Sequence, residues 1–317
     1  MADFEFTKRV LFIGVPDMAF VGIDTLTYAG VNIVGVIGPK KTHNMYQTFK
    51  NFVKSRNLNF IEYDSIKDNS LIETIKLLNI DIAVVNSFND KIPKKFIDAI
   101  PNGIINVHPS LLPYYRGGNP YSRVIMNGET KTGVTLHFMS EEFDTGDIIA
   151  QEVCEVDPKE TMGTIFNKTN AIGASMLVKA LMYFEKHGNL PRTKQPDGEF
   201  ITAPNLKDEE MVINYNVPAE QTERLIRALN PYFSAMTFFK NTPIKIYKAS
   251  VDKVKGIEKF SNGEICKIEQ DKIYIKTADG CLIPEIMQYG GYFTGDCTDL
   301  IHFIKAKVGE KFTNGYT

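Results

Sequence analysis

The fold is indicated first by RVLFIGVPDMAFVGIDTLTYAGVNIVGVIG, residues 9–38. Two apolar runs in it, 9–15 and 32–38, have the length of buried strands, and the stretch 17–30 between them has the length of a helix. A strand, a helix and a second strand in this order are typical of a βαβ unit, whose two strands lie parallel in one sheet. The turn after the first strand, GVPDMAF, lacks the glycine fingerprint of dinucleotide-binding proteins.

The same alternation continues through the first half of the chain. We expect further strands at 59–64, 82–88, 103–109, 133–139 and 148–156, and helices at 45–56, 68–79, 118–127 and 160–187. In the last of these helices, apolar residues from Ile165 to Phe184 recur at helical spacing. The pattern predicts an α/β fold with a mostly parallel sheet.

After residue 188 the composition and the pattern of expected elements change. Residues 189–205, NLPRTKQPDGEFITAPN, are rich in proline, glycine and polar residues and predict a linker. After a helix at 218–230, turn residues separate short β-runs at 235–241, 243–251, 262–270, 271–280 and 281–290. Such spacing is typical of a small antiparallel barrel. We therefore expect an α/β domain at 1–188, a linker at 189–205 and a β-barrel domain at 206–317.

Composition and charge exclude several classes of protein. The net charge of the 317 residues is −2, so no overall positive field attracts nucleic acid or an acidic membrane. No apolar run approaches the roughly 20 residues that cross a bilayer, and the N-terminus lacks a signal-peptide cleavage site. The four cysteines form no C-x-x-C pair, so we expect neither a disulfide framework nor a metal site. A cytoplasmic protein is the expectation.

Two separate stretches carry candidate chemistry: GIINVHPSLLPYYRGG at 103–118 and FDTGD at 143–147. The period-2 alternation of a strand puts Asn106 and His108 on one face, at the carboxyl end where open α/β sheets bind ligands. An amide and an imidazole there suit a carbonyl oxygen that becomes negative during acyl transfer. Asp144, on a glycine-bearing turn, is placed to orient the histidine or to accept a proton from an amine.

Each of these residues alone has an ordinary structural explanation. A single strand histidine is usually core or surface, DTGD is a common turn, and Arg116 is expected to be a surface side chain. The combination is more specific: N-x-H-x-S-L-L-P-x-x-x-G is followed, beyond the next strand, by D-T-G-D.

With these residues the chain resembles the folate-dependent formyltransferase family, which includes methionyl-tRNA formyltransferases and amino-sugar N-formyltransferases. The resemblance also rests on NGE at 127–129 and TGVTLHFM at 132–139, and it extends over nearly the whole chain. It implies a Rossmann-like core followed by a small, OB-like β-barrel domain. It also implies an enzyme that moves a formyl group from 10-formyltetrahydrofolate to an amine and needs no metal.

The resemblance implies roles for individual residues. Asn106 and His108 would stabilise the oxyanion, and Asp144 would assist removal of a proton from the attacking amine. The folate would be held mainly through backbone contacts, at Ile92, Ser110, Leu111, Leu112, Pro113, Gly117, Glu142 and Phe143.

Several amines compete as the acceptor. Residues 205–317 contain as many basic as acidic residues, a poor surface for tRNA phosphates. The segment 38–57 is shorter than the loop of tRNA formyltransferases, and we interpret its Lys40 and Lys41 as solvated charges. His137 stands where sugar-modifying relatives commonly carry a histidine, although we expect a packed strand histidine first. A nucleotide-linked amino sugar is the preferred acceptor; the alternatives are methionyl-tRNA and another small or carrier-bound amine, and the oligomeric state stays open.

Two further classes of protein remain. A folate-binding protein without turnover would not need both His108 and Asp144, so the complete set argues against it. A formyl-folate hydrolase uses water in place of the amine; such enzymes usually carry an N-terminal regulatory domain, whereas this sequence begins directly at the first strand.

Overall fold

The computed structural model describes residues 5–315 except 89, 271 and 292, and the chain divides into two compact units. The first unit comprises Met1–Gly117, Lys131–Glu155 and Asn167–Ala203, and the second comprises Gly118–Thr130, Val156–Phe166 and Pro204–Thr317. The units thus alternate along the chain, and the boundaries expected at 188 and 206 stay a prediction. No helix in the described part of the chain is both long and apolar enough to cross a membrane. The cytoplasmic location likewise stays a prediction.

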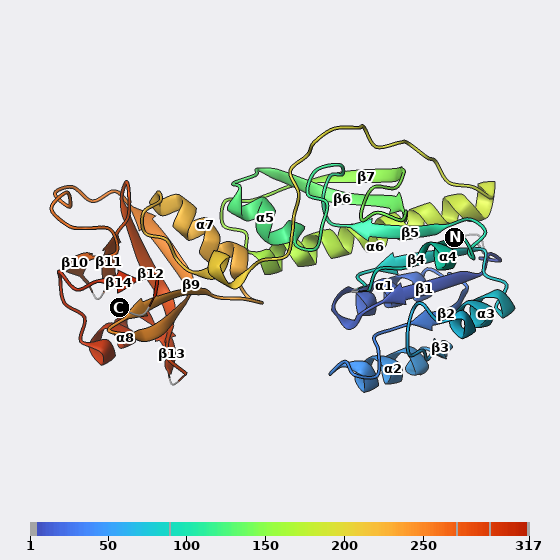
Figure 1. Cartoon of the computed structure of the whole chain (residues 1–317), viewed down its shortest axis with the longest axis horizontal. Helices are drawn as coiled ribbons and strands as arrows, with labels where there is room; N and C mark the ends of the chain where they lie inside the picture. The colour runs from blue at the N-terminus through green and yellow to red at the C-terminus, as the bar shows by residue number, and fades with distance from the viewer. Residues whose placement is uncertain (1–4, 89, 271, 292, 316–317) are drawn as a thin grey trace. The chain divides into compact units, whose positions relative to one another are not determined.

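The first unit contains a seven-stranded sheet with the strand order β3-β2-β1-β4-β5-β6-β7 (Figure 1). The pairs among β1 to β5 are parallel, and only the pairs β5–β6 and β6–β7 are antiparallel. The predicted mostly parallel, Rossmann-like sheet is therefore confirmed. Its strands are β1 (Val10–Gly14), β2 (Ile33–Ile37), β3 (Phe60–Ile61), β4 (Ile82–Asn86), β5 (Ile104–His108), β6 (Lys131–Phe138) and β7 (Ile148–Glu155).

The long helices that accompany this sheet begin and end within a few residues of their predicted bounds. The short helix α4 was not predicted, because a single turn leaves no apolar periodicity to detect. The helices are α1 (Pro16–Tyr28), α2 (Tyr46–Ser55), α3 (Asn69–Leu77), α4 (Lys94–Ile97) and α6 (Met162–His187).

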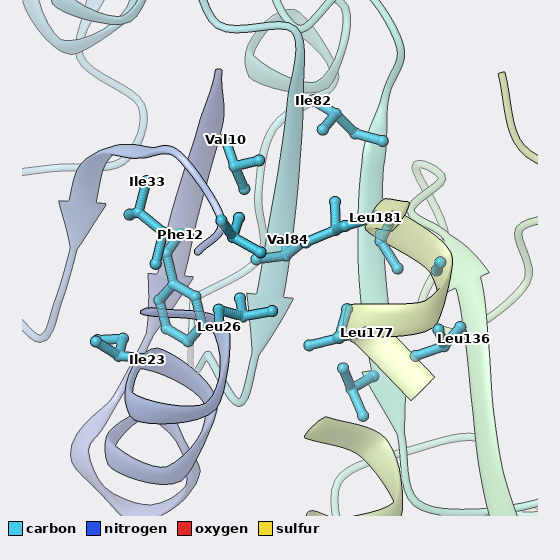
Figure 2. Close-up of a cluster of buried hydrophobic side chains, with 14 of the residues drawn as sticks. Val10, Phe12, Ile23, Leu26, Ile33, Ile82, Val84, Leu136, Leu177 and Leu181 are labelled. Carbon is cyan, nitrogen blue, oxygen red and sulfur yellow. The ribbon is translucent and has the colours of Figure 1, made fainter. Parts of the chain in front are cut away.

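Both faces of β1 are buried, as its continuous apolar run requires. Val10 and Phe12 join a cluster that includes side chains of α1 and α6 (Figure 2). Leu11 and Ile13 point to the other face and join a second cluster, which includes side chains of α3. Because successive side chains of a strand point to opposite faces, a strand covered on both sides must be apolar throughout.

The second unit contains a seven-stranded antiparallel sheet, with the order β10-β11-β12-β9-β8-β14 and β13 paired to β12. Backbone bonds bring the two ends of this order together: Ile265 N–H donates to Glu310 O, and Phe312 N–H donates to Gly263 O, both at 2.8 Å. The sheet curls into a half-barrel, which confirms the predicted C-terminal β-domain. Its strands are β8 (Ala235–Phe239), β9 (Thr242–Asp252), β10 (Ile265–Glu269), β11 (Lys272–Lys276), β12 (Cys281–Tyr289), β13 (Phe293–Asp296) and β14 (Phe312–Thr313).

The helices of the second unit come from distant parts of the sequence. Ser122 in α5 donates its hydroxyl to Ala228 O at 2.7 Å, and Arg123 forms an ion pair with Glu210 at 2.6 Å. These bonds hold α5 to residues that follow it by roughly a hundred positions. The helices are α5 (Pro120–Met126), a 3-10 turn at Asp208–Met211, α7 (Ala219–Leu229) and α8 (Cys297–Ile304); α8, β13 and β14 were not predicted.

Candidate active site

The strands β5 and β6 place a group of polar side chains on one face of the first sheet. In the antiparallel register, Asn106 lies opposite His137 and His108 lies opposite Thr135. Residues directly opposite one another, and residues two apart on one strand, share a face. Asn106 and His108 therefore lie together, as the alternation predicts, and the neighbouring strand adds His137 to them.

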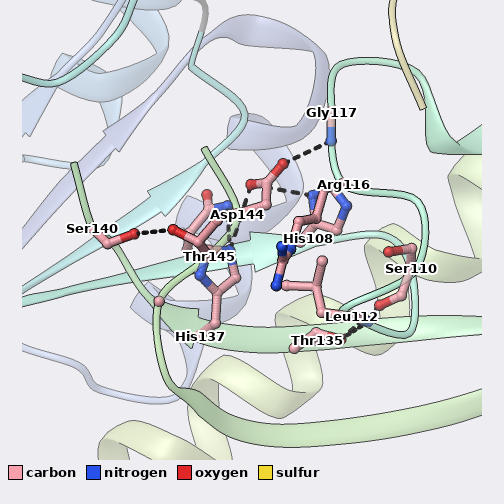
Figure 3. Close-up of polar contacts among 12 residues, drawn as sticks. His108, Ser110, Leu112, Arg116, Gly117, Thr135, His137, Ser140, Asp144 and Thr145 are labelled. Atoms are coloured by element: carbon pink, nitrogen blue, oxygen red, sulfur yellow. Dashed lines mark hydrogen bonds and ion pairs between the residues drawn. The ribbon is translucent and has the colours of Figure 1, made fainter. Parts of the chain in front are cut away.

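Asp144 reaches this group from the turn between β6 and β7 (Figure 3). Its Oδ1 atom lies 3.6 Å from His108 Nδ1 and also 3.6 Å from His137 Nε2. Its Oδ2 atom accepts the backbone N–H of Gly117 at 2.9 Å. The carboxylate, two imidazoles and the Asn106 amide thus form one connected cluster.

The ring of His108 is buried and its orientation is fixed. Nε2 lies 2.8 Å from the carbonyl oxygen of Tyr115, which only accepts, so this nitrogen carries the proton. Burial lowers the pKa of His108 below its ordinary value, against the opposing effect of Asp144. In the neutral ring, Nδ1 and the Asp144 carboxylate are then two acceptors that face each other. A proton or a donor group from a bound molecule would join them.

His137 orients the amide of Asn106. Its Nδ1 lies 2.9 Å from Phe138 O and must donate there, so Nε2 is the acceptor for Asn106 Nδ2–H at 3.0 Å. The ring is packed within the sheet, as expected for a strand histidine, and it is also part of the polar cluster. The amide orientation matters because only its N–H groups, not its oxygen, can stabilise a developing negative charge.

Asp144 is ionised at neutral pH. Burial alone would raise the pKa of this carboxyl, but His137 and His108 in their protonated form, together with the Gly117 N–H, lower it to about 2. The cluster therefore presents a buried negative charge beside a neutral imidazole, and this charge would stabilise the pair after it takes up a proton.

The loop after β5 wraps around His108 and contains most of the residues predicted to contact folate. Thr135 fixes this loop: its hydroxyl donates to Ser110 O at 2.6 Å and accepts the N–H of Leu112 at 3.1 Å. The Ser110 hydroxyl donates to Tyr114 O at 2.7 Å, so it serves the loop itself. The predicted residues in the loop are Ser110, Leu111, Leu112, Pro113 and Gly117, and their contact with folate stays a prediction.

The other three predicted folate residues lie on two neighbouring segments. The side chain of Ile92 is buried in the hydrophobic core, whereas those of Glu142 and Phe143 are exposed. Lys91 joins the segments: its Nζ lies 3.9 Å from Glu142 Oε1 and 5.6 Å from the centre of the Phe143 ring. A contact through the backbone of Ile92 remains compatible with this placement, and it stays a prediction.

Comparisons with known proteins identify the family. Residues 8–181 match the family model described as formyl transferase, and residues 205–300 match that of the formyl transferase C-terminal domain. The chain belongs to the formyl transferase family. The resemblance inferred from the sequence is therefore confirmed, and the protein is an enzyme of this family.

The relatives of this formyl transferase have different names and were solved with different bound molecules. The methionyl-tRNA formyltransferase of Syntrophus aciditrophicus is 31% identical over 95% of this chain and 97% of its own, and that of Clostridioides difficile is 33% identical over 88% and 92%. Among solved structures, the N-formyltransferase from Helicobacter canadensis, in complex with folinic acid and dTDP-3-aminofucose, has a TM-score of 0.68. It is 18% identical and covers 89% of this chain and 100% of its own. HypX from Aquifex aeolicus, in complex with tetrahydrofolic acid, has a TM-score of 0.64 and is 18% identical. The match covers 96% of this chain and 48% of HypX. At these identities the structural likeness shows the fold alone.

Sequence reasoning missed two residues next to the cluster of this formyl transferase. Arg116, expected on the surface, is half-buried, and Gln195, in the expected linker, is 4% exposed. The Arg116 guanidinium bonds to the Gln195 side chain, with Nη2 at 2.5 Å from Oε1. No local pattern marks either residue, because their bonds join segments far apart in the chain.

The glycine of the DTGD turn is required by a close backbone approach. A Cβ atom on Gly146 would lie 1.8 Å from Phe138 O, so Gly146→Ala must displace the turn that carries Asp144. We expect a loss of roughly 1–3 kcal/mol in the free energy of unfolding, together with a lower kcat. Denaturant unfolding and steady-state kinetics measure the two effects. The control is Gly291→Ala, where a Cβ meets nothing within 4 Å; equal behaviour of both variants would contradict the prediction.

The lowered pKa of Asp144 also predicts how stability depends on pH. The folded-state pKa of about 2 lies below the ordinary value of 3.8, so the ionised carboxylate stabilises the fold above pH 3.8. This contribution, roughly 2 kcal/mol, is lost as the pH falls from about 4 to about 2. The free energy of unfolding of the wild type should therefore fall more steeply there than that of Asp144→Asn. Parallel curves for the two proteins would show that the carboxylate is not stabilised.

Proposed function

We propose that this enzyme transfers a formyl group from 10-formyltetrahydrofolate to a primary amine, with Asn106, His108 and Asp144 at the reacting atoms. The observation that carries the proposal is the convergence of these three side chains from two strands and a turn. The donor assignment is supported by the structural relatives whose complexes contain folinic acid or tetrahydrofolic acid.

The cluster supplies what formyl transfer requires. The folate supplies the activated formyl carbon, and the amine nitrogen forms a bond to it as the bond to the folate nitrogen breaks. One N–H of Asn106 bonds to His137, which leaves the second for the formyl oxygen as it becomes negative. Asp144, ionised and buried, accepts the proton that the amine loses, and His108 beside it relays a proton toward the leaving nitrogen.

We infer that the amine belongs to a nucleotide-linked amino sugar. In segment 38–57, compared above with the loop of tRNA formyltransferases, two lysines are paired with acids: Lys40 with Asp90 at 2.9 Å, and Lys41 with Glu62 at 3.7 Å. In the second unit, several basic side chains are paired with acids in the same way, including Lys240–Glu310 and Lys248–Glu285. Phosphate contacts supply much of the affinity of proteins for nucleic acid, and paired lysines contribute less to it.

Methionyl-tRNA is the second candidate acceptor, favoured by the sequence relatives. The methionyl-tRNA formyltransferases of Syntrophus aciditrophicus and Clostridioides difficile align with this chain over most of its length. The proposed chemistry at Asn106, His108 and Asp144 is the same for both acceptors, so the cluster does not distinguish them.

The test is formyl release from 10-formyltetrahydrofolate with a panel of acceptors. The panel contains nucleotide-linked 3-amino and 4-amino sugars, charged initiator tRNA, free methionine and no amine. We expect turnover with an amino sugar and little dependence of its KM on salt. Turnover with tRNA alone, with a KM that rises steeply with salt, would overturn the acceptor assignment. Equal release without any amine would identify a hydrolase instead.

A further inference from the structure

The segment 193–203, expected to be a linker, crosses the two loops that hold the cluster. At one end, Thr193 exchanges backbone bonds with Ile148, at 2.8 and 2.9 Å. At the other end, Tyr115 N–H donates to Ile201 O at 2.6 Å, and Ala203 N–H donates to Arg116 O at 2.7 Å. The segment is therefore bonded both to the loop after β5 and to the end of the turn that carries Asp144. We call residues 193–203 the crossing segment.

Gln195 is the buried side chain of the crossing segment that joins the two loops directly. Its Nε2 donates to Asp144 O and to Gly146 O, both at 2.8 Å. Its Oε1 accepts from Arg116 Nε at 3.2 Å and from Arg116 Nη2 at 2.5 Å. A side-chain amide has two donors and two acceptor positions, so all of its capacity is used.

Two residues bonded to the crossing segment have an unfavourable backbone conformation. Asp144 has φ of 57° and Tyr115 has φ of 61°, left-handed values that residues other than glycine adopt at a cost. Both residues matter to the cluster, since Asp144 provides the carboxylate and Tyr115 O holds His108 Nε2. Such backbone persists only where surrounding bonds fix it. The Gln195 bonds fix the Asp144 peptide, while the crossing segment fixes the peptide N–H of Tyr115.

We propose that Gln195 is a positioning residue for formyl transfer: it holds the backbone of Asp144 so that the carboxylate meets His108. The inference rests on the proposed function, because it assigns Gln195 an effect that passes through Asp144. A displacement of about 1 Å in a reacting group can cost around a hundredfold in rate. Loss of the two N–H donors of Gln195 should therefore lower kcat while the binding of both substrates stays intact.

The first test compares three variants by kcat, by the KM of donor and acceptor, and by thermal unfolding. Gln195→Glu keeps the acceptor for Arg116 but replaces Nε2, which carries both donors, by an oxygen that repels the carbonyls of Asp144 and Gly146. We expect kcat to fall roughly ten- to hundredfold with KM nearly unchanged. Gln195→Met, of similar length and without donors, should lower kcat in the same direction. Lys194→Met, whose exposed partner is Asp197, is the control and should keep the wild-type rate.

The second test is a double-mutant cycle with Asp144→Asn, measured by single-turnover kinetics. If Gln195 acts through Asp144, Gln195→Glu changes the remaining rate of Asp144→Asn by less than about threefold, because coupled residues are not additive. An equal fold-loss in both backgrounds, or a wild-type kcat for folded Gln195→Glu, would overturn the positioning role. A wild-type rate for Asp144→Asn itself would instead overturn the proposed role of Asp144, so the two failures are distinct.

Discussion

Asp144→Asn should lower kcat for formyl transfer by roughly 10²–10⁴-fold while the KM for the folate donor changes little. The asparagine keeps the size and the bond from Gly117 N–H, but it cannot take the proton that the attacking amine loses. The pKa of the native carboxyl is held at about 2, so the loss should persist throughout the pH range in which the enzyme is folded. Steady-state kinetics from pH 5 to 9 measure it.

The matched control lies three residues away in the same turn. Asp147 is the second acid of DTGD, and its side chain is 38% exposed and pairs with Arg192 at 3.9 Å. Asp147→Asn removes a charge from the same turn without touching the cluster, so it should keep a near-normal rate. If Asp144→Asn were the active variant and Asp147→Asn the inactive one, the proton acceptor would have to be assigned to Asp147.

Asn106→Leu should lower kcat by roughly 10²–10³-fold, the usual effect of removing one donor to an oxyanion. Leucine has a similar volume, so we expect the sheet to stay folded. It leaves His137 Nε2 without the donor that Asn106 provides. Rapid-quench measurement of a single turnover isolates the chemical step, and urea unfolding shows that the variant is folded.

A second asparagine, in the turn before β5, serves as the control for this substitution. Asn102 precedes β5, at the end away from the cluster, and donates its side-chain N–H to Asp81 O at 2.9 Å. Asn102→Leu also removes one side-chain hydrogen bond, but it takes no donor away from the reacting atoms. Equal losses of kcat in Asn102→Leu and Asn106→Leu would mean that the effect is one of stability.

The sequence predicts those parts of the site that depend on one element. The apolar alternation of β5 is enough to place Asn106 and His108 on one face at its carboxyl end. The position of Asp144 follows from a turn after the next strand, supported by the family resemblance. The roles of His137 and Gln195 depend on the pairing of β5 with β6 and on the path of a segment that looks like a linker. Contacts of this kind leave no period or motif in a single sequence.

In the second unit, one missed element did have a local signal. Asp296 caps the N-terminus of α8, and its side chain accepts the N–H of Asp299 at 3.0 Å. An aspartate before an apolar stretch is a common helix start, so CTDLIHFI was open to prediction. The strand β14 is different: it is two residues long, and only its pairing with β8 defines it.

The bonds that tie α5 to later residues bear on how the second unit can be exchanged between relatives. A chimera joined at a single point near residue 204 would combine Ser122 and Arg123 from one parent with their partners, Ala228 and Glu210, from the other. The interior contacts of the second unit would then be mismatched before any acceptor is bound. A grafted second unit must therefore carry three pieces of chain, Gly118–Thr130, Val156–Phe166 and Pro204–Thr317, from the same parent.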